Sequence, residues 1–257
     1  MACLAYEVGL EGPGVTAEIK SATDPKTQLK HDVYTIKVGP IRWNDGQVLQ
    51  VGFLGGKAWQ RQKVAEIAVQ WTYHANISFN FDPDLKGEDP YDILVSFDSK
   101  QGSWSKLGTH SRNSAQAGVA SMNLSGINEY IREENIQRTI LHEFGHALGR
   151  GHMHQNPWRT EQDSVSFDPE AVYASYAEWP REKVNRNVLA EYDLNWEEIS
   201  ERMRVRMMDL IFPKFDIHSV MIYPFDSSLT LGGNGGTPFN CELSDGDKYA
   251  ISRAYPM

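Results

Sequence analysis

The amino-acid sequence predicts an α+β fold, in which a twisted mixed β-sheet is backed by two long helices in an N-terminal lobe. Three observations carry this prediction. Segments with strand and helix patterns follow the order strand–helix–strand–strand–strand–helix. After Gly151 the sequence becomes loop-rich and charged. A chain of 257 residues with 40% hydrophobic side chains is long enough for one large domain or two lobes. We therefore expect a cleft bordered by a mostly irregular and helical C-terminal lobe.

The elements of the N-terminal lobe are expected in chain order. Strands are predicted at residues 47–54, 77–81 and 92–97. A helix is predicted at 57–75, where apolar residues recur on one side. A second helix is predicted at 138–149; it is apolar on most sides and should be central and buried. Glu133 and Glu134 suit its N-terminal turn, because the helix dipole favours negative charge there.

Residues 1–40 contain Gly, Pro, Asp and Thr in a loose pattern, with one alternating stretch at 32–38. We interpret them as a leader, which is either a pro-segment or an extra strand. Residues 41–257 are expected to form the catalytic domain, with an N-terminal lobe at 41–151 and a C-terminal lobe at 152–257. Within the C-terminal lobe the expected segments are loops at 157–169 and 231–237 and a partly helical stretch at 180–208.

The second helix contains the most informative motif of the chain. Residues 142–152 read HEFGHALGRGH, which has the spacing H-E-x-x-H-x-x-G-x-x-H. Residues four apart on a helix lie on one face, so His142 and His146 can bind a single metal ion. Glu143 is one step round the helix, where it can reach a metal-bound water without binding the metal itself.

The chain must then turn back towards the same metal. Gly149 permits the left-handed backbone conformation that commonly ends a helix, and Gly151 keeps the following turn free of side-chain obstruction. His152 can therefore serve as the third ligand. Three protein ligands leave one position of Zn²⁺ open, which is the arrangement of a catalytic zinc site.

A second motif, SVMIYP at Ser219–Pro224, follows the third histidine, with Met221 lying 69 residues after His152. Paired with the zinc motif, it resembles the Met-turn of the metzincin metalloproteases, in which a methionine lies beneath the three histidines. Met221 would take that place. Tyr223 resembles the tyrosine of the astacin and serralysin families, which is an extra zinc ligand that swings away and hydrogen-bonds the tetrahedral intermediate.

Other segments favour astacins. Residues 102–108 (GSWSKLG) resemble the astacin segment G-C-W-S-x-x-G, and residues 117–124 resemble the following edge strand, along which the family's substrates lie. Residues 243–256 resemble the closing helix of bacterial and fungal astacin-like peptidases. Calcium-binding glycine repeats, which would indicate a serralysin, are absent from the sequence. The chain is thus identified as an astacin-like zinc metallopeptidase of the bacterial or fungal type.

The sequence also departs from the animal astacins. Met153 replaces the Glu that follows the third histidine, so the family's salt bridge from that Glu to a processed N-terminus is not available. Ser103 stands where the family has Cys, so that family disulfide is missing. His154 is expected to be a bystander that points away from the metal.

The resemblance implies a zinc-dependent endopeptidase that acts on protein or peptide substrates. Zn²⁺ held by His142, His146 and His152 would activate a water, with Glu143 as general base. Tyr223 would stabilise the oxyanion, and Met221 would support the site. Two alternatives are left open: a latent or inactive zinc-containing protein that binds peptides without cutting them, and a zinc hydrolase of a non-peptide amide.

The composition of the chain limits the kinds of partner that the protein can bind and bears on its cellular compartment. A net charge of −9 argues against nucleic acid, and no apolar run is long enough for a membrane span. No signal peptide is visible, although the resemblance suggests secretion, so the compartment stays open; we expect a monomer. Cys3 and Cys241 form a disulfide or stay free, or else Cys3 binds the zinc in a latent form.

Overall fold

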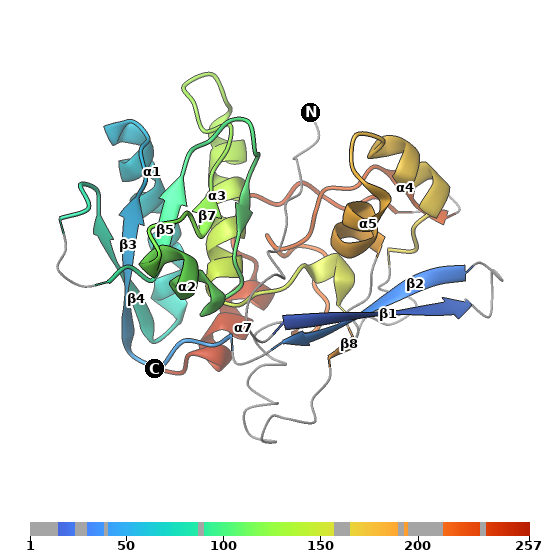
Figure 1. Ribbon diagram of the computed structural model, residues 1–257, viewed down its shortest axis with the longest axis horizontal. Coiled ribbons are helices and arrows are strands. Elements are labelled where there is room, and N and C mark those ends of the chain that lie inside the picture. Colours follow the sequence, from blue (N-terminus) through green and yellow to red (C-terminus); the bar gives the residue numbers. More distant parts are fainter. Residues whose placement is uncertain are drawn as a thin grey trace.

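A computed structural model of the 257-residue chain describes both backbone and side chains over most of its length (Figure 1). These ranges are 41–86, 90–156, 165–185, 187–189, 213–231 and 235–257. For residues 15–23, 30–38, 186 and 193–194 it describes the backbone alone. No helix in the described part of the chain is long and apolar enough to span a lipid bilayer.

A five-stranded mixed sheet forms the N-terminal lobe, as predicted. Its strands are β3 (Gln47–Phe53), β4 (Ile77–Asp82), β5 (Ile93–Ser96), β6 (Trp104–Ser105) and β7 (Met122–Asn123). They are arranged in the order β4-β3-β5-β7-β6. The first three pairings are parallel, and β6 alone runs antiparallel, against β7.

The prediction of an edge strand at 117–124 was wrong in two respects. Only Met122–Asn123 is a strand, and it lies between β5 and β6, so β6 forms the edge. Residues 117–121 instead follow helix α2 (His110–Gln116) and form a turn at Gly118, whose φ is +73°. Gly118 ends the helix in the left-handed conformation, and too few residues remain before Met122 for a longer strand.

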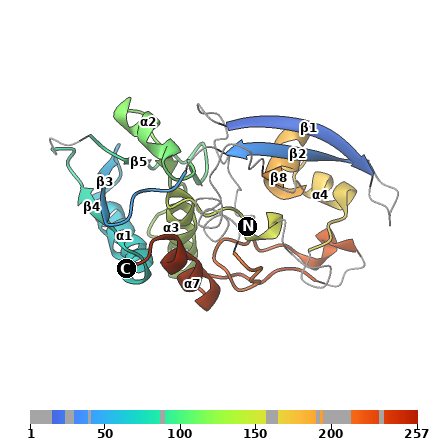
Figure 2. The same ribbon diagram turned by 90° about the horizontal axis from the view of Figure 1, so that it is seen from below.

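Two long helices pack side by side, and α2 lies on the other side of the sheet (Figure 2). α1 (Ala58–Ala68) and α3 (Glu133–Ala147) match the two predicted helices. The first ends earlier than predicted, because residues 69–74 tighten into the 3₁₀ helix η1 (Val69–His74). Its sequence, VQWTYH, is rich in β-branched and aromatic residues, which are weak helix formers.

The end of α3 is fixed by residues that are far away in the sequence. Trp43 donates its indole N–H to the carbonyl of Ala147 at 2.8 Å, and the Tyr255 hydroxyl donates to the carbonyl of Leu148 at 2.8 Å. Both aromatic side chains are fully buried. The last carbonyls of a helix have no partner within it, so these two bonds satisfy groups that would otherwise be buried unpaired.

The C-terminal lobe is irregular and helical, as predicted. It contains α4 (Pro169–Ser175), α5 (Arg181–Val184), a π-helical turn η3 (Asn185–Leu189), the short 3₁₀ helix η4 (Ser227–Leu229) and α7 (Asp245–Ala254). Of the predicted stretch at 180–208, the part at 181–189 is helical and most of the remainder lies outside the described residues. The same holds for 157–164 and 232–234 of the predicted loops.

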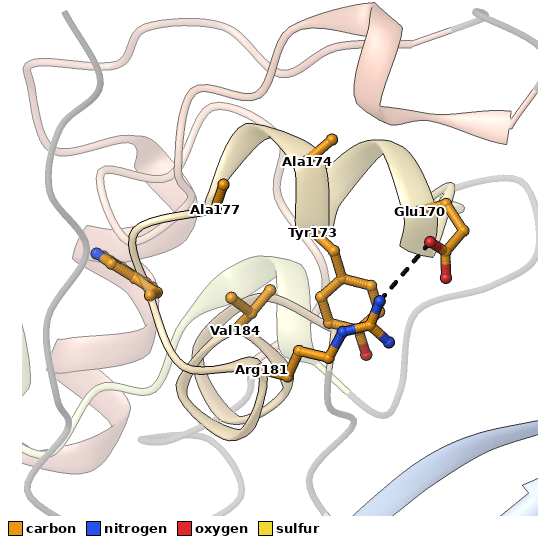
Figure 3. A pocket seen from close by; sticks show the side chains of 7 residues that line it. Glu170, Tyr173, Ala174, Ala177, Arg181 and Val184 are labelled. Carbon is orange, nitrogen blue, oxygen red and sulfur yellow. Dashed lines mark ion pairs between the residues drawn. The ribbon is translucent and has the colours of Figure 1, made fainter.

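Helices α4 and α5 enclose a shallow cavity of about 320 Å³ (Figure 3). It is lined by Glu170, Tyr173, Ala174, Ala177, Trp179, Arg181 and Val184. The Arg181 guanidinium lies 4.2 Å from the centre of the Tyr173 ring and 3.8 Å from a Glu170 oxygen. Because Arg181 and Glu170 are both exposed, this ion pair contributes little to stability.

The leader forms two strands of a separate sheet. β1 (Val15–Thr23) pairs antiparallel with β2 (Lys30–Val38), and β2 pairs parallel with β8 (Asp193–Leu194) from the C-terminal lobe. β2 includes the alternating stretch that suggested an extra strand. The division into a leader at 1–40 and a catalytic domain at 41–257 stays a prediction, as does a pro-segment role.

Gly108, the last residue of GSWSKLG, lies closely against the start of the domain. Its φ is +51°, and a Cβ built there would lie 1.8 Å from the carbonyl oxygen of Ile41. Its N–H donates to the carbonyl of His146 at 2.9 Å. The segment therefore joins the chain at Ile41 to helix α3, and only glycine fits at this contact.

We expect Gly108→Ala to lower the free energy of unfolding by about 3 kcal/mol or more, because both the backbone conformation and a backbone atom oppose the added methyl group. Gly118→Ala is the matched control: Gly118 also has a positive φ, of +73°, but nothing lies within 4 Å of its Cβ position. That variant should lose only about 1–2 kcal/mol. Urea unfolding of both variants measures the difference, and equal losses would contradict the prediction.

Candidate metal centre

Three buried histidines converge on one point. α3 presents His142 and His146 one turn apart, and the chain then reverses at Gly149, whose φ is +98°. His152 returns to the same place, so that its Nε2 lies 3.1 Å from that of His146, which is also 3.1 Å from that of His142. The metal-binding atoms of all three lie within 4.8 Å of one another.

The other ring nitrogen of each histidine has an oxygen partner. The three Nδ1–H groups donate to oxygens on Val220, Arg150 and Gln155: His142 to the Val220 carbonyl at 2.9 Å, His146 to the Arg150 carbonyl at 2.7 Å, and His152 to Gln155 Oε1 at 3.0 Å. An oxygen of this kind can only accept, so Nδ1 carries the hydrogen. Each Nε2 then presents a lone pair to the shared point.

Burial keeps these rings neutral. Desolvation lowers the pKa of His146 to about 4 and lowers the pKa values of His142 and His152 well below their usual range. Neutral imidazole is the form that binds metal. Three lone pairs that face one another at this separation repel, and a cation at their centre removes the repulsion.

The spacing of the nitrogens fits zinc. Zn–N bonds of ~2.0–2.1 Å in tetrahedral geometry place two ligand nitrogens about 3.3 Å apart. The observed 3.1 Å separations are close to this value. Three imidazole ligands without a fourth protein ligand are also the donor set of many catalytic zinc sites.

Glu143 follows the first ligand on α3 and is buried. Desolvation raises its pKa to about 8, and the guanidinium of Arg138, one turn earlier, opposes this rise. A divalent cation at the histidines would favour the charged carboxylate in the same way as Arg138. A cation at the histidines would therefore lower the pKa of the Glu143 carboxyl group.

Met221 packs against α3 between the first two ligands. A Cβ on Gly145 would lie 2.4 Å from the Met221 sulfur, so the methionine occupies the space that a larger residue would fill. The backbone N–H of Met153, which follows the third ligand, donates to the Met221 carbonyl at 3.0 Å. The Met-turn, residues 219–224, therefore contacts both parts of the metal motif.

Tyr223 lies beside the ligands. Its ring centre is 4.5 Å from that of His152 and 5.4 Å from that of His142, and the residue is 7% exposed. The hydroxyl of Thr237 donates to the Tyr223 carbonyl and so holds this end of the turn. The structure thus gathers five of the six residues that the sequence singled out, and the sixth, Glu143, is buried on α3 next to His142 in the chain.

His154 is not a member of the group of converging metal-binding atoms among the described residues. Its Nε2 instead lies 3.1 Å from the carbonyl oxygen of Asn187. Its ring centre is nevertheless 5.2 Å from that of His152 and 4.9 Å from that of Tyr223. His154 is therefore a buried packing partner of two site residues.

The two departures from the animal astacins have local structural consequences. Ser103 forms hydrogen bonds with the backbone of Ser125 in both directions, at 3.3 Å and 3.1 Å, which join the segment without a disulfide. Met153 is buried in the hydrophobic core. Cys241 is partly exposed and has no disulfide partner in the described part of the chain, while Cys3 lies outside it, so the alternatives for this pair stay predictions.

Sequence reasoning missed the residues that orient the ligands. Arg150 and Gln155 accept hydrogen bonds from the rings of His146 and His152, and Asp247 is bonded in turn to Arg150; all three residues are fully buried. Ser244 and Asp247 have the spacing of a capping box, which signals the start of a helix but not a contact with a distant segment. Gln155 follows His152 by three residues, and no pattern in the sequence marks it as an acceptor.

Known structures resemble this chain over most of its length. Two structures of myroilysin are each 32% identical to it in sequence. The alignment with the first covers 84% of this chain and 96% of the myroilysin chain, with a TM-score of 0.69. The alignment with the second covers 85% of this chain and 87% of the myroilysin chain, with a TM-score of 0.57. High choriolytic enzyme 1 (HCE-1), a hatching enzyme zinc-protease from the medaka fish Oryzias latipes, is 18% identical in sequence. Its alignment covers 84% of this chain and 94% of the HCE-1 chain, with a TM-score of 0.48. The chain matches no protein-family model and no curated protein.

We expect Gln155→Leu to weaken metal binding about tenfold or more, because His152 loses the acceptor that orients its ring. Gln155→Glu restores an acceptor and should bind metal as tightly as the unaltered chain. Competition with a chromogenic chelator measures both affinities. Unchanged affinity of Gln155→Leu would show that His152 is oriented by other contacts.

Proposed function

Because this chain belongs, with myroilysin, to the astacin-like family of zinc metallopeptidases, we propose that His142, His146 and His152 bind its zinc ion. The protein is a zinc-dependent endopeptidase, and its substrates are proteins or peptides. The observation that carries the ligand assignment is the convergence of three Nε2 lone pairs, each oriented by an oxygen bonded to Nδ1.

Zinc held by these nitrogens would supply Lewis-acid polarisation of the scissile carbonyl and lower the pKa of the attacking water. Glu143 is assigned as general base. Its carboxylate takes the proton of the attacking water and then delivers it to the nitrogen of the leaving amine. Because Glu143 is buried and adjacent to a ligand, the proton stays within the site between the two transfers.

Tyr223 is assigned as the donor to the oxyanion of the tetrahedral intermediate. Its ring lies against His152, so its phenol belongs to the same small volume as the ligands. Met221 is assigned a supporting role, since its side chain fills the space at Gly145 between the first two ligands.

Strand β6 is the edge at which an extended peptide can pair. Among the described strands it contacts only β7, so one side of its backbone has no strand partner. Unpaired backbone groups at a sheet edge accept another strand, whatever its side chains. We assign peptide binding to this edge instead of to residues 117–124.

The presence of Glu143 favours hydrolysis over binding alone, because a site that only binds peptides needs no base. Secretion, which the family resemblance suggests, and a monomeric state both stay predictions. Both are open to direct measurement, the first by fractionation of producing cells and the second by size-exclusion chromatography with light scattering.

We expect Glu143→Gln to bind zinc normally but to lose activity by about 10²–10⁴-fold, because the amide cannot accept the proton. Cleavage of casein, measured with and without a zinc chelator, tests this. Glu134→Gln, on the exposed first turn of α3, is the matched control and should cleave at the unaltered rate. Substantial cleavage by Glu143→Gln would remove Glu143 from the mechanism.

We expect Tyr223→Phe to lower kcat about 10²-fold with little change in KM, because one hydrogen bond to the oxyanion is lost only in the transition state. Tyr130→Phe is the control, since Tyr130 is 89% exposed. Steady-state kinetics on a fluorogenic peptide provides the measurement. An unaltered kcat would show that the phenol takes no part in catalysis.

A further inference from the structure

One carboxylate outside the metal motif is bonded to both segments that orient the first two ligands. Asp247 lies in the first turn of α7 and is fully buried. Its two oxygens accept four hydrogen bonds, which come from the Val220 N–H at 2.9 Å, the Ser219 hydroxyl at 2.6 Å, Arg150 Nη2 at 3.0 Å and the Ser244 N–H at 3.3 Å.

The first path runs to His142. Val220 donates its N–H to Asp247, and its carbonyl accepts the hydrogen of His142 Nδ1. Val220 is therefore held by Asp247 through its N–H, and it orients His142 through its carbonyl. A shift of Val220 would turn the His142 ring and move its Nε2 away from the metal.

The second path runs to His146. The Arg150 side chain forms an ion pair with Asp247 in which both side chains are 0% exposed, and the Arg150 carbonyl accepts the hydrogen of His146 Nδ1 at 2.7 Å. Arg150 lies just past the end of α3, where the chain has left the helix and its position depends on other contacts. Breaking a buried ion pair leaves an uncompensated charge, so the pair holds this segment firmly.

A third contact reaches the Met-turn at Met221. The Ser219 hydroxyl donates to Asp247 and accepts the N–H of Met221 at 3.1 Å. Asp247 therefore fixes the carbonyl that orients His142, the carbonyl that orients His146, and the backbone of the methionine beneath them. His152 is oriented separately, through Gln155.

We propose that Asp247 is a positioning residue of the zinc centre, which sets the geometry of His142 and His146 through Val220 and Arg150. This inference rests on the proposed ligand set. Residues outside the direct ligands commonly change metal affinity or activity by about 10–100-fold when they are removed, because they fix ring orientation.

The chain contains a comparable pair for a control. Asp92 accepts from Arg112 Nε at 2.8 Å and from the backbone N–H of Gln50 at 3.0 Å, so it too joins an arginine and a backbone group. Asp92 is buried at the start of β5 and contacts neither the ligands nor the Met-turn in any hydrogen bond that the structure describes. Asp92→Asn should lower stability and leave the zinc centre unchanged.

The test compares Asp247→Asn with Asp92→Asn, using full-length protein. We expect Asp247→Asn to weaken zinc binding about tenfold or more in chelator competition. Its cobalt-substituted form should show an altered visible spectrum, and kcat should fall while KM changes little. Asp92→Asn should match the unaltered protein in all three measurements. If Asp247→Asn matches it as well, and only its unfolding free energy falls, the proposal is overturned.

Ser219→Ala provides a second variant, in case Asp247→Asn does not fold. It removes the shortest of the four bonds with little change in volume, and we expect weaker zinc binding and a shifted cobalt spectrum. Unaltered affinity and spectrum in this variant would overturn the proposal. His142→Ala distinguishes a failure of the proposal on Asp247 from a failure of the proposed ligand set. Zinc affinity that survives the loss of His142 would contradict the ligand set itself.

Discussion

The structure of this protein depends on the orientation of three imidazole rings. Each ring must turn a lone pair towards one point, and three such lone pairs repel one another unless a cation lies between them. The oxygens bonded to Nδ1 maintain this arrangement, and they come from three separate places: the Met-turn, the turn that follows α3, and a side chain beyond His152. Asp247 is hydrogen-bonded to Val220 and Arg150, the two residues whose carbonyls are the first two of these oxygens.

This requirement explains why polar groups are abundant in an otherwise apolar region. Arg138 donates to the carbonyls of Ile222 and Asn240, and Asn240 donates to the carbonyls of Ile217 and Ser219. A buried arginine is costly unless its donors are bonded, and here the bonds connect α3 to the backbone of the Met-turn.

The sequence predicted the parts of the structure that local pattern controls. The spacing of the histidines follows from the helix period, and Gly149 adopts the left-handed conformation that the turn needs. The order of the first three strands and of the two long helices was likewise predicted from the sequence pattern, whereas β6 and α2 were not. Two errors came from the same source: residues 69–74 and 117–121 form a 3₁₀ helix and a turn, because local propensity and tertiary contacts decide short segments that periodicity cannot resolve. The roles of Arg150, Gln155 and Asp247 depend on contacts between distant segments, which no single-sequence pattern records.

The contacts at the end of α3 also join residues that are synthesised at very different times. Trp43, Tyr255 and the cap of α7 hold the helix end and the Met-turn, and they lie near opposite ends of the domain. A nascent chain that has emerged only as far as the third histidine has all three ligands but lacks the residues that orient two of them. The complete set of contacts that hold the helix end and the Met-turn therefore forms only after the final helix has been synthesised.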